Sequence, residues 1–282
     1  MLETPVGWVL LLIVGTVTGT LSGLLGIGGG LLMVPVLTLF GIPLVQATAT
    51  SLIGVLLSAL SGSVQNLRTG DLNWRSSLTL ALFGIMTAQL GAWMGDRIPD
   101  PALSLAFAGL ILVAIQLITL KRTLKRTLQK QPIDPATGLA AAAPAATLRQ
   151  LLLPLALIGL LAGVLSGLFG VGGGVVMVPL QMLFLGETIK AAVRTSLGAI
   201  VPIAISGLAR HALNQNVLWI PGICLGLGGI LGAQLGTRML PKLGDRTVNR
   251  LFRLFLLALA VYMAIRGGRG FLAPAAVGFL PS

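Results

Sequence analysis

The chain has 282 residues, of which 55% are hydrophobic and only 9% are charged, and its mean hydropathy is +0.98. Soluble domains carry about 25% charged residues, so seven acidic and nineteen basic residues cannot cover a soluble protein of this length. The composition excludes a water-soluble enzyme and predicts an all-α polytopic membrane protein. The single cysteine, Cys224, lies in an apolar run, which excludes a disulfide framework.

Apolar segments follow one another along the whole chain. A helix rises about 1.5 Å per residue and the hydrocarbon core is about 30 Å thick, so a crossing needs roughly 20 residues. Crossings are expected at 6–26, 47–67, 76–95, 102–120, 151–170, 191–211, 217–237 and 249–266. Two shorter apolar segments, 28–41 and 172–185, cover only about 21 Å. They are either half-helices that begin inside the bilayer or crossings of a locally thin membrane.

The first apolar segment is expected to be a retained helix, because Glu3 stands where a signal peptide carries positive charge. Lys and Arg collect on the cytoplasmic side of membrane proteins. If the short segments cross the membrane, both termini lie outside the cell, with fifteen basic residues on the cytoplasmic side and four on the outer side. If they enter the membrane and leave it on the same side, eleven basic residues lie on one side and eight on the other. The first arrangement is favoured. It accounts for the net charge of +12 without a nucleic-acid partner.

The chain contains an internal repeat. Residues 19–40 (GTLSGLLGIGGGLLMVPVLTLF) match residues 163–184 (GVLSGLFGVGGGVVMVPLQMLF) at about two thirds of positions with an offset of 144, and later segments match at an offset of 145. We divide the chain into a first membrane repeat (1–120), a cytoplasmic basic and Ala/Pro-rich linker (121–150) and a second membrane repeat (151–282). Five apolar segments in each repeat place the second copy upside down. Inverted repeats are typical of secondary transporters, which bind their substrate near the bilayer midplane.

Clustered glycines interrupt both repeats at the same position. They end one helix, and the helix that restarts after them exposes unpaired N–H groups with a partial positive charge. Two such starts facing each other would bind a small oxyanion without a charged side chain. The expected binding residues are Gly28, Gly29, Gly30, Gly172, Gly173 and Gly174. The alternative is close helix packing or a tight surface turn. Under the binding interpretation, Val in place of Gly29 or Gly173 weakens anion binding more than it lowers folded yield.

Glycines at every fourth position just before these clusters are expected to be architectural, because small residues let helix backbones approach in lipid. They are Gly15, Gly19, Gly23, Gly159, Gly163 and Gly167.

Few polar residues lie within the apolar segments. Those that are expected either to donate to an anion or to join helices are Thr50, Ser51, Gln89, Thr195, Ser196 and Gln234. Arg68, Arg210 and the single histidine, His211, are candidates for gating or coupling, the alternative for His211 being a solvated interfacial residue.

All seven acidic residues fall near helix ends or in loops, which disfavours a cation as substrate. The sequence offers no catalytic residue set, and neither a metal site nor a cofactor is expected.

The duplicated motif G-x-x-S-G-x-x-G-h-G-G-G-x-x-M-V-P (h, apolar), followed by T-S-L in both copies, resembles the sulfite exporter TauE/SafE family of bacterial membrane transporters. The element R-x-G-x-h-x-W is matched by Arg68, Gly70, Leu72 and Trp74. The second copy departs from it, with Gln215 and Asn216 where the first has Gly70 and Asp71, so the halves are not equivalent. The resemblance implies a multi-pass protein of the bacterial inner membrane that exports sulfite or small organosulfonates.

The leading hypothesis is a transporter, not an enzyme, that exports a small sulfur-containing oxyanion by alternating access. An anion leaving a negative-inside cell moves downhill, so export needs no titratable relay within the membrane. An importer or channel for a similar anion such as thiosulfate, or a membrane-embedded enzyme, is the alternative. The expected partners are the small anion and membrane lipid, and homo-oligomerisation is left open.

Overall fold

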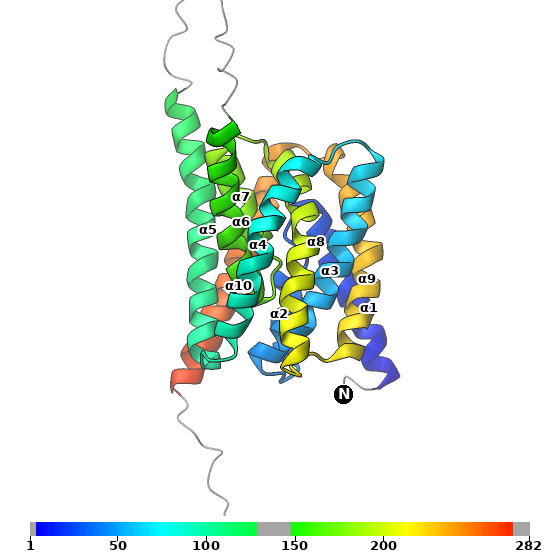
Figure 1. The fold of residues 1–282 in the computed structure, drawn as a ribbon. Helices are drawn as coiled ribbons and strands as arrows, with labels where there is room; N and C mark the ends of the chain where they lie inside the picture. The colour runs from blue at the N-terminus through cyan, green and yellow to red at the C-terminus, as the bar shows by residue number, and fades with distance from the viewer. Residues whose placement is uncertain (1–3, 129–147, 273–282) are drawn as a thin grey trace, which may run out of the picture.

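The computed structural model describes residues 4–128 and 148–272, and over these ranges the chain is helical without strands (Figure 1), which confirms the predicted all-α fold. The first half comprises α1 (Pro5–Leu25), α2 (Gly30–Leu39), α3 (Leu44–Arg68), α4 (Trp74–Gly95) and α5 (Asp100–Leu128). The second comprises α6 (Leu148–Phe169), α7 (Gly174–Phe184), α8 (Ile189–Leu213), α9 (Trp219–Met239), the 3-10 turn η2 (Leu240–Lys242) and α10 (Asp245–Leu272). Most of the expected linker lies outside the described residues.

Within the part of the chain that the structure describes, six helical segments are long and apolar enough to cross a membrane: Pro5–Leu25, Leu44–Arg68, Trp74–Gly95, Leu152–Phe169, Ile189–Leu213 and Trp219–Lys242. Large apolar side chains on their outer faces are exposed, among them Leu78, Leu82, Met86, Leu153 and Leu157. Exposed apolar surface on this scale, on helices long enough to span a bilayer, indicates contact with lipid. The protein is therefore a multi-pass membrane protein.

Helices α5 and α10 cover the crossings expected at 102–120 and 249–266 but are not among these six. Helix α5 continues to Leu128, past the expected end of its crossing and through the basic run KRTLKRTL. Helix α10 likewise begins with the charged sequence DRTVNR. The apolar pattern of the sequence shows where each crossing ends. A helix can extend beyond this point into polar residues that favour helical backbone, as Lys and Arg do.

The two short apolar segments form short helices. Helix α2 has 10 residues and α7 has 11, so each spans only about 15–17 Å, half of a bilayer core. Each starts after glycines in the left-handed region, with φ of 78° and 84° at Gly28 and Gly29 and of 75° and 76° at Gly172 and Gly173. Residues with a Cβ rarely adopt this conformation, so the glycines end α1 and α6 and allow α2 and α7 to set off in new directions.

Each half packs its first helix on the other half. Along α1, a Cβ added to Gly15 or Gly19 would overlap the backbone of Leu225 or Gly229 in α9. Along α6, the equivalent Gly159 and Gly163 approach the backbone of α4 at Leu80 and Gly84, which are related to Leu225 and Gly229 by the repeat offset of 145. The predicted architectural role of the spaced glycines is confirmed. The two halves are thus interlocked rather than side by side.

Equivalent helices run in opposite directions in Figure 1. Helix α1 starts at the end of the molecule marked N, whereas α6 starts at the opposite end, where α5 ends. Inverted repeats require this relation between helices. Their orientation across a membrane stays a prediction.

Candidate functional site

The two glycine breaks meet at the centre of the molecule. A Cβ on Gly28 would lie 2.9 Å from Val55 and 3.3 Å from Ile200, and one on Gly172 would lie 2.8 Å and 2.9 Å from the same two side chains. Val55 and Ile200 are equivalent residues near the middle of α3 and α8. The predicted placement of two helix starts facing each other therefore matches the geometry, while their role in binding stays a prediction.

Main-chain N–H groups at both breaks lack acceptors. No oxygen of the described residues accepts a hydrogen bond from the N–H groups of residues 27–31 or 171–175, and neither short helix has a side-chain N-cap. All of these residues are buried. Unpaired N–H groups and the positive end of the helix dipole attract an anion, so the two breaks form a pair of anion-binding candidates.

Two serines beside the breaks escaped the sequence analysis. Ser22 and Ser166 are fully buried, and their hydroxyls have no hydrogen-bond partner among the described residues. Their carbonyls accept bonds from Gly26 N at 2.7 Å and Gly170 N at 2.8 Å, and Ser22 Cβ lies 3.6 Å from the position of a Cβ on Gly29. The signal was present, because both serines belong to the duplicated motif. A buried hydroxyl normally has a partner, so these two are further candidate donors to a ligand.

The neighbouring serine pair has a structural role. The Ser51 hydroxyl donates to Gly170 O at 2.9 Å, and the Ser196 hydroxyl donates to Gly26 O at 2.8 Å. Each serine therefore connects its own half to the glycine break of the other half. Both are fully buried, so each bond satisfies a carbonyl that water cannot reach.

The remaining predicted polar residues lie at helix contacts. Thr50 Oγ1 accepts from Leu218 N at 3.0 Å, and the Thr195 carbonyl accepts from the Ser77 hydroxyl at 2.8 Å. Gln89 is largely exposed and donates to the carbonyl of Ser206 at 2.8 Å. Gln234 is half-buried on α9. These contacts favour the helix-joining alternative for Thr50 and Gln89, and direct contact of any of the four with an anion stays a prediction.

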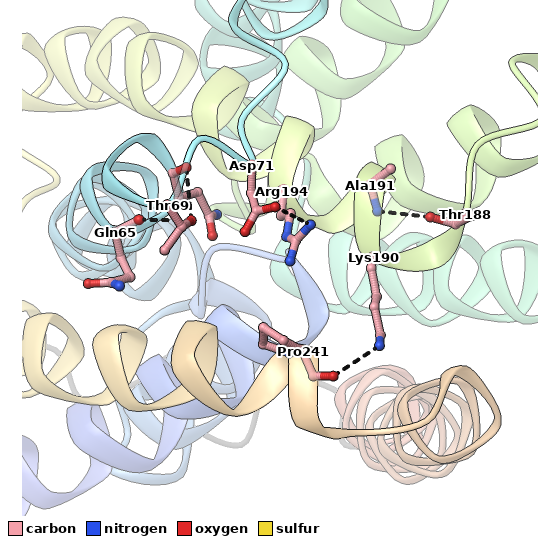
Figure 2. A network of polar contacts seen from close by, with 9 residues as sticks. Gln65, Thr69, Asp71, Thr188, Lys190, Ala191, Arg194 and Pro241 are labelled. Atoms are coloured by element: carbon pink, nitrogen blue, oxygen red, sulfur yellow. Dashed lines mark hydrogen bonds and ion pairs between the residues drawn. The ribbon is translucent and has the colours of Figure 1, made fainter.

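Polar contacts lie at the end of the molecule where α5 ends and α6 begins, and one of them joins the two halves. Arg194 on α8 forms an ion pair with Asp71 in the α3–α4 connection, with Nη1 and Oδ1 3.0 Å apart (Figure 2). Beside it, Lys190 donates to the carbonyl of Pro241 at 3.3 Å (Figure 2). We name the Asp71–Arg194 pair the linker-side latch. The gating candidate Arg68 is exposed at the end of α3, on the same side.

A second set of contacts closes the other end. The carboxylate of Asp96, which follows α4, accepts bonds from the side-chain amides of Asn214 and, at 2.8 Å, Asn216 in the α8–α9 connection. We name these three residues the far-side latch. The gating candidates His211 and Arg210 lie next to it in the last turn of α8. His211 is fully buried, so the alternative of a solvated interfacial histidine is wrong. With both sets of contacts formed, residues 27–31 and 171–175 at the glycine breaks are buried.

Arg194→Gln should leave folding nearly intact while loosening the linker-side latch. The Arg194 and Asp71 side chains are 19% and 37% exposed. An ion pair that is this exposed to solvent contributes about 0–1 kcal/mol to the free energy of unfolding. Thermal unfolding should therefore shift by only a few degrees, whereas hydrogen exchange at residues 27–31 should become faster. Arg75→Gln, which removes the same charge from a residue lying over the Trp74 ring on the same side, is the control. Equal exchange in both variants would show that the pair does not restrict access.

Comparison with known proteins places this geometry in a family. A profile of the family described as sulfite exporter TauE/SafE matches residues 11–263. The chain is 27% identical to the probable membrane transporter protein YunE of Bacillus subtilis, covering 92% of this chain and 98% of that protein. It is 27% identical to the probable membrane transporter protein MJ0441 of Methanocaldococcus jannaschii, covering 91% and 95%. A probable membrane transporter protein of Xylella fastidiosa is 29% identical, covering 89% and 93%.

No solved structure matches the chain significantly. The family match extends over nearly all of the described helices, including both glycine breaks and both latches, and thus confirms the resemblance noted from the duplicated motif. The chain belongs to the sulfite exporter TauE/SafE family of membrane transporters.

Proposed function

We propose that this transporter exports a small sulfur-containing oxyanion, sulfite or an organosulfonate, across the bacterial inner membrane by alternating access. The observation that carries the proposal is the pair of buried glycine breaks, each with unpaired main-chain N–H groups and an unpaired serine hydroxyl. The anion would bind on the Ser22 side of one break, the Ser166 side of the other, or both.

Neutral donors suit an oxyanion that must be released again. Each helix start supplies roughly half a positive charge, and hydrogen bonds to an ionised acceptor are about twice as strong as neutral ones. The acidic side chains Asp71, Asp96 and Asp100 lie at helix ends, away from the central Val55 and Ile200. Among the described residues a cation would find no carboxylate at the breaks, whereas an anion would find donors without a repelling charge.

The arrangement of the halves supports alternating access. Serine hydroxyls hold each break to the opposite half, and one latch closes each end, so exchanging which latch is open would expose the same central site to either face. The inverted orientation of the repeats is part of this proposal.

Outward movement follows from the membrane potential. Moving one unit charge through 100 mV changes its free energy by about 2.3 kcal/mol, so an anion leaves a negative-inside cell without another coupled ion. An importer or channel for a similar anion such as thiosulfate is the second candidate, and the same flux measurement separates them.

The test is flux in proteoliposomes. Vesicles loaded with labelled sulfoacetate and given an inside-negative potassium diffusion potential should release it faster than vesicles without potential, and reversing the potential should slow release. Release should saturate with internal concentration, as expected for a carrier; linear dependence would indicate a channel. Protein-free liposomes measure leakage. No release from vesicles with correctly inserted protein, across sulfite, thiosulfate, sulfoacetate and taurine, would contradict the proposal.

A further inference from the structure

The single histidine of the chain is buried in one defined hydrogen-bonding arrangement. His211 is fully buried, and its Nε2 lies 2.9 Å from the carbonyl oxygen of Gly167 in α6. A carbonyl oxygen only accepts hydrogen bonds, so Nε2 must carry the hydrogen. The second ring nitrogen, Nδ1, is therefore the atom that gains or loses a proton.

Nδ1 faces a carboxylate without bonding to it. Asp96 Oδ1 lies 3.9 Å away, too far for a hydrogen bond, and Nδ1 has no hydrogen-bond partner among the described residues. In the neutral imidazole Nδ1 carries a lone pair 3.9 Å from this anion, whereas a protonated Nδ1 carries a positive charge and an N–H in the same place. Protonation thus turns a repulsive contact into an attractive one.

The surroundings provide one charge of each sign and a route to water. Asp96 at the end of α4 and Arg210, which lies on α8 next to His211, are the charged groups that act on the imidazole, while α6 contributes the Gly167 carbonyl. The Asp96 side chain is 23% exposed, whereas the His211 side chain is fully buried. The carboxylate that faces Nδ1 is thus in partial contact with solvent.

This arrangement occurs in one half only. The repeat offset of 145 places Asn66 at the position equivalent to His211 and Pro241 at the position equivalent to Asp96, and neither side chain titrates. The two ends of the molecule, otherwise built from equivalent helices, thus differ in their response to pH.

We propose that His211 and Asp96 form a proton-binding site that controls the far-side latch. A proton taken up from solvent binds Nδ1, the imidazolium and the Asp96 carboxylate form an ion pair, and the end of α8 is held between α4 and α6. Loss of that proton to solvent weakens the closure. Helix α6, whose Gly167 carbonyl accepts the His211 bond, carries Ser166 next to Gly167 and leads into the second glycine break. Control of transport by this site rests on the function proposed above, whereas proton binding does not.

Nitrogen NMR tests proton binding without transport. The full chain, labelled with 15N-histidine and purified through a tag without histidine, gives the signals of one imidazole. We expect Nδ1 to gain and lose a proton as the pH of the sample is changed, while Nε2 keeps its hydrogen. Asp96→Asn should move the midpoint by about one pH unit or more, and Asp71→Asn, at the opposite end, should leave it in place. An imidazole that does not titrate, or that titrates at Nε2, would overturn the proposal.

Flux measurements test the control of transport. Release of a sulfonate, whose sulfonate group stays ionised throughout the titration measured by NMR, is followed at equal pH on both sides of the vesicle. We expect wild-type flux to fall at least about fivefold from the alkaline to the acidic end of the titration measured by NMR. His211→Asn, which installs the side chain of Asn66, should remove this dependence; Asp96→Asn serves if that variant does not fold. Equal pH dependence in wild type and variant overturns the inference. Absence of wild-type flux at every pH, together with a titrating Nδ1, instead contradicts the proposed function.

Discussion

Gly167→Ala should abolish most of the folded protein although it adds one methyl group. Gly167 lies on α6 where this helix crosses α4, and its added Cβ would overlap the Ala88 carbonyl and lie 2.6 Å from Ala92 N. Both contacts are with backbone, so no side-chain rotation relieves them and the helices must separate. Overpacking of this kind costs about 1–3 kcal/mol, and more where backbone cannot move. In lipid, close packing is also the main force that holds these helices together.

The matched control is Gly109→Ala. Gly109 is exposed on α5, and a Cβ there has no atom within 4 Å. Alanine in a helix interior is favoured over glycine by about 1 kcal/mol, so this variant should be as stable as wild type or more so. For both variants, the monodisperse fraction in size-exclusion chromatography measures the folded yield and the thermal unfolding midpoint measures the stability. Similar values for the two variants would contradict the interlocked packing of the halves.

Removing the Ser22 and Ser166 hydroxyls together should reduce anion affinity about tenfold or more without loss of stability. Neither hydroxyl has a hydrogen-bond partner among the described residues, so replacing each serine with alanine breaks no hydrogen bond between them. A hydrogen bond to a charged group contributes about 1.5–3 kcal/mol, and about 1.4 kcal/mol corresponds to a factor of ten in affinity. Scintillation proximity binding and thermal unfolding of the same Ser22→Ala, Ser166→Ala protein report the two quantities.

The control is the Ser51→Ala, Ser196→Ala protein. These hydroxyls are equally buried but donate to Gly170 O and Gly26 O, so their removal leaves two carbonyls unpaired at about 1–3 kcal/mol each. This variant should lose stability. A serine pair that behaves in the reverse way, with Ser22 and Ser166 required for folding and not for binding, would show that the unpaired hydroxyls are structural.

Serine substitutions test the site more cleanly than glycine substitutions. A Cβ on Gly173 would lie 2.6 Å from the carbonyl oxygen of Ala162, and both Gly29 and Gly173 have positive φ. Val at either position therefore strains the backbone, and at Gly173 it also clashes with α6. The expectation that Val lowers binding more than folded yield applies at most to Gly29, whose added Cβ would meet the flexible end of Met33 at 3.2 Å.

Much of the fold was predictable because the chain repeats itself. Glycine clusters at equivalent positions indicated two helix breaks, and a spacing of four between Gly15 and Gly19 indicated a helix contact. The partner of that contact was not predictable, because a row of small residues fits any closely approaching backbone. The division into repeats therefore gave no sign that α1 packs on α9 of the other half.

The roles of single hydroxyl groups in the candidate site were not predictable from the sequence either. Ser22 and Ser51 look alike in the sequence, since both are small polar residues in apolar segments. Whether a hydroxyl is engaged depends on which carbonyl of the other half lies within reach, as Gly170 O does for Ser51. Likewise, the burial of His211 against Gly167 depends on the contact between α8 and α6, which no local pattern encodes.

The most direct test of the account is to locate a bound oxyanion. Selenite has the pyramidal shape of sulfite and is likewise an anion, and selenium scatters anomalously, so crystals grown with selenite mark its position. The account predicts an anomalous peak within hydrogen-bonding distance of the N–H groups of residues 27–31 or 171–175, lost in the Ser22→Ala, Ser166→Ala protein. Selenite found only against basic residues at the helix ends, in protein that binds it saturably, would contradict binding at the glycine breaks.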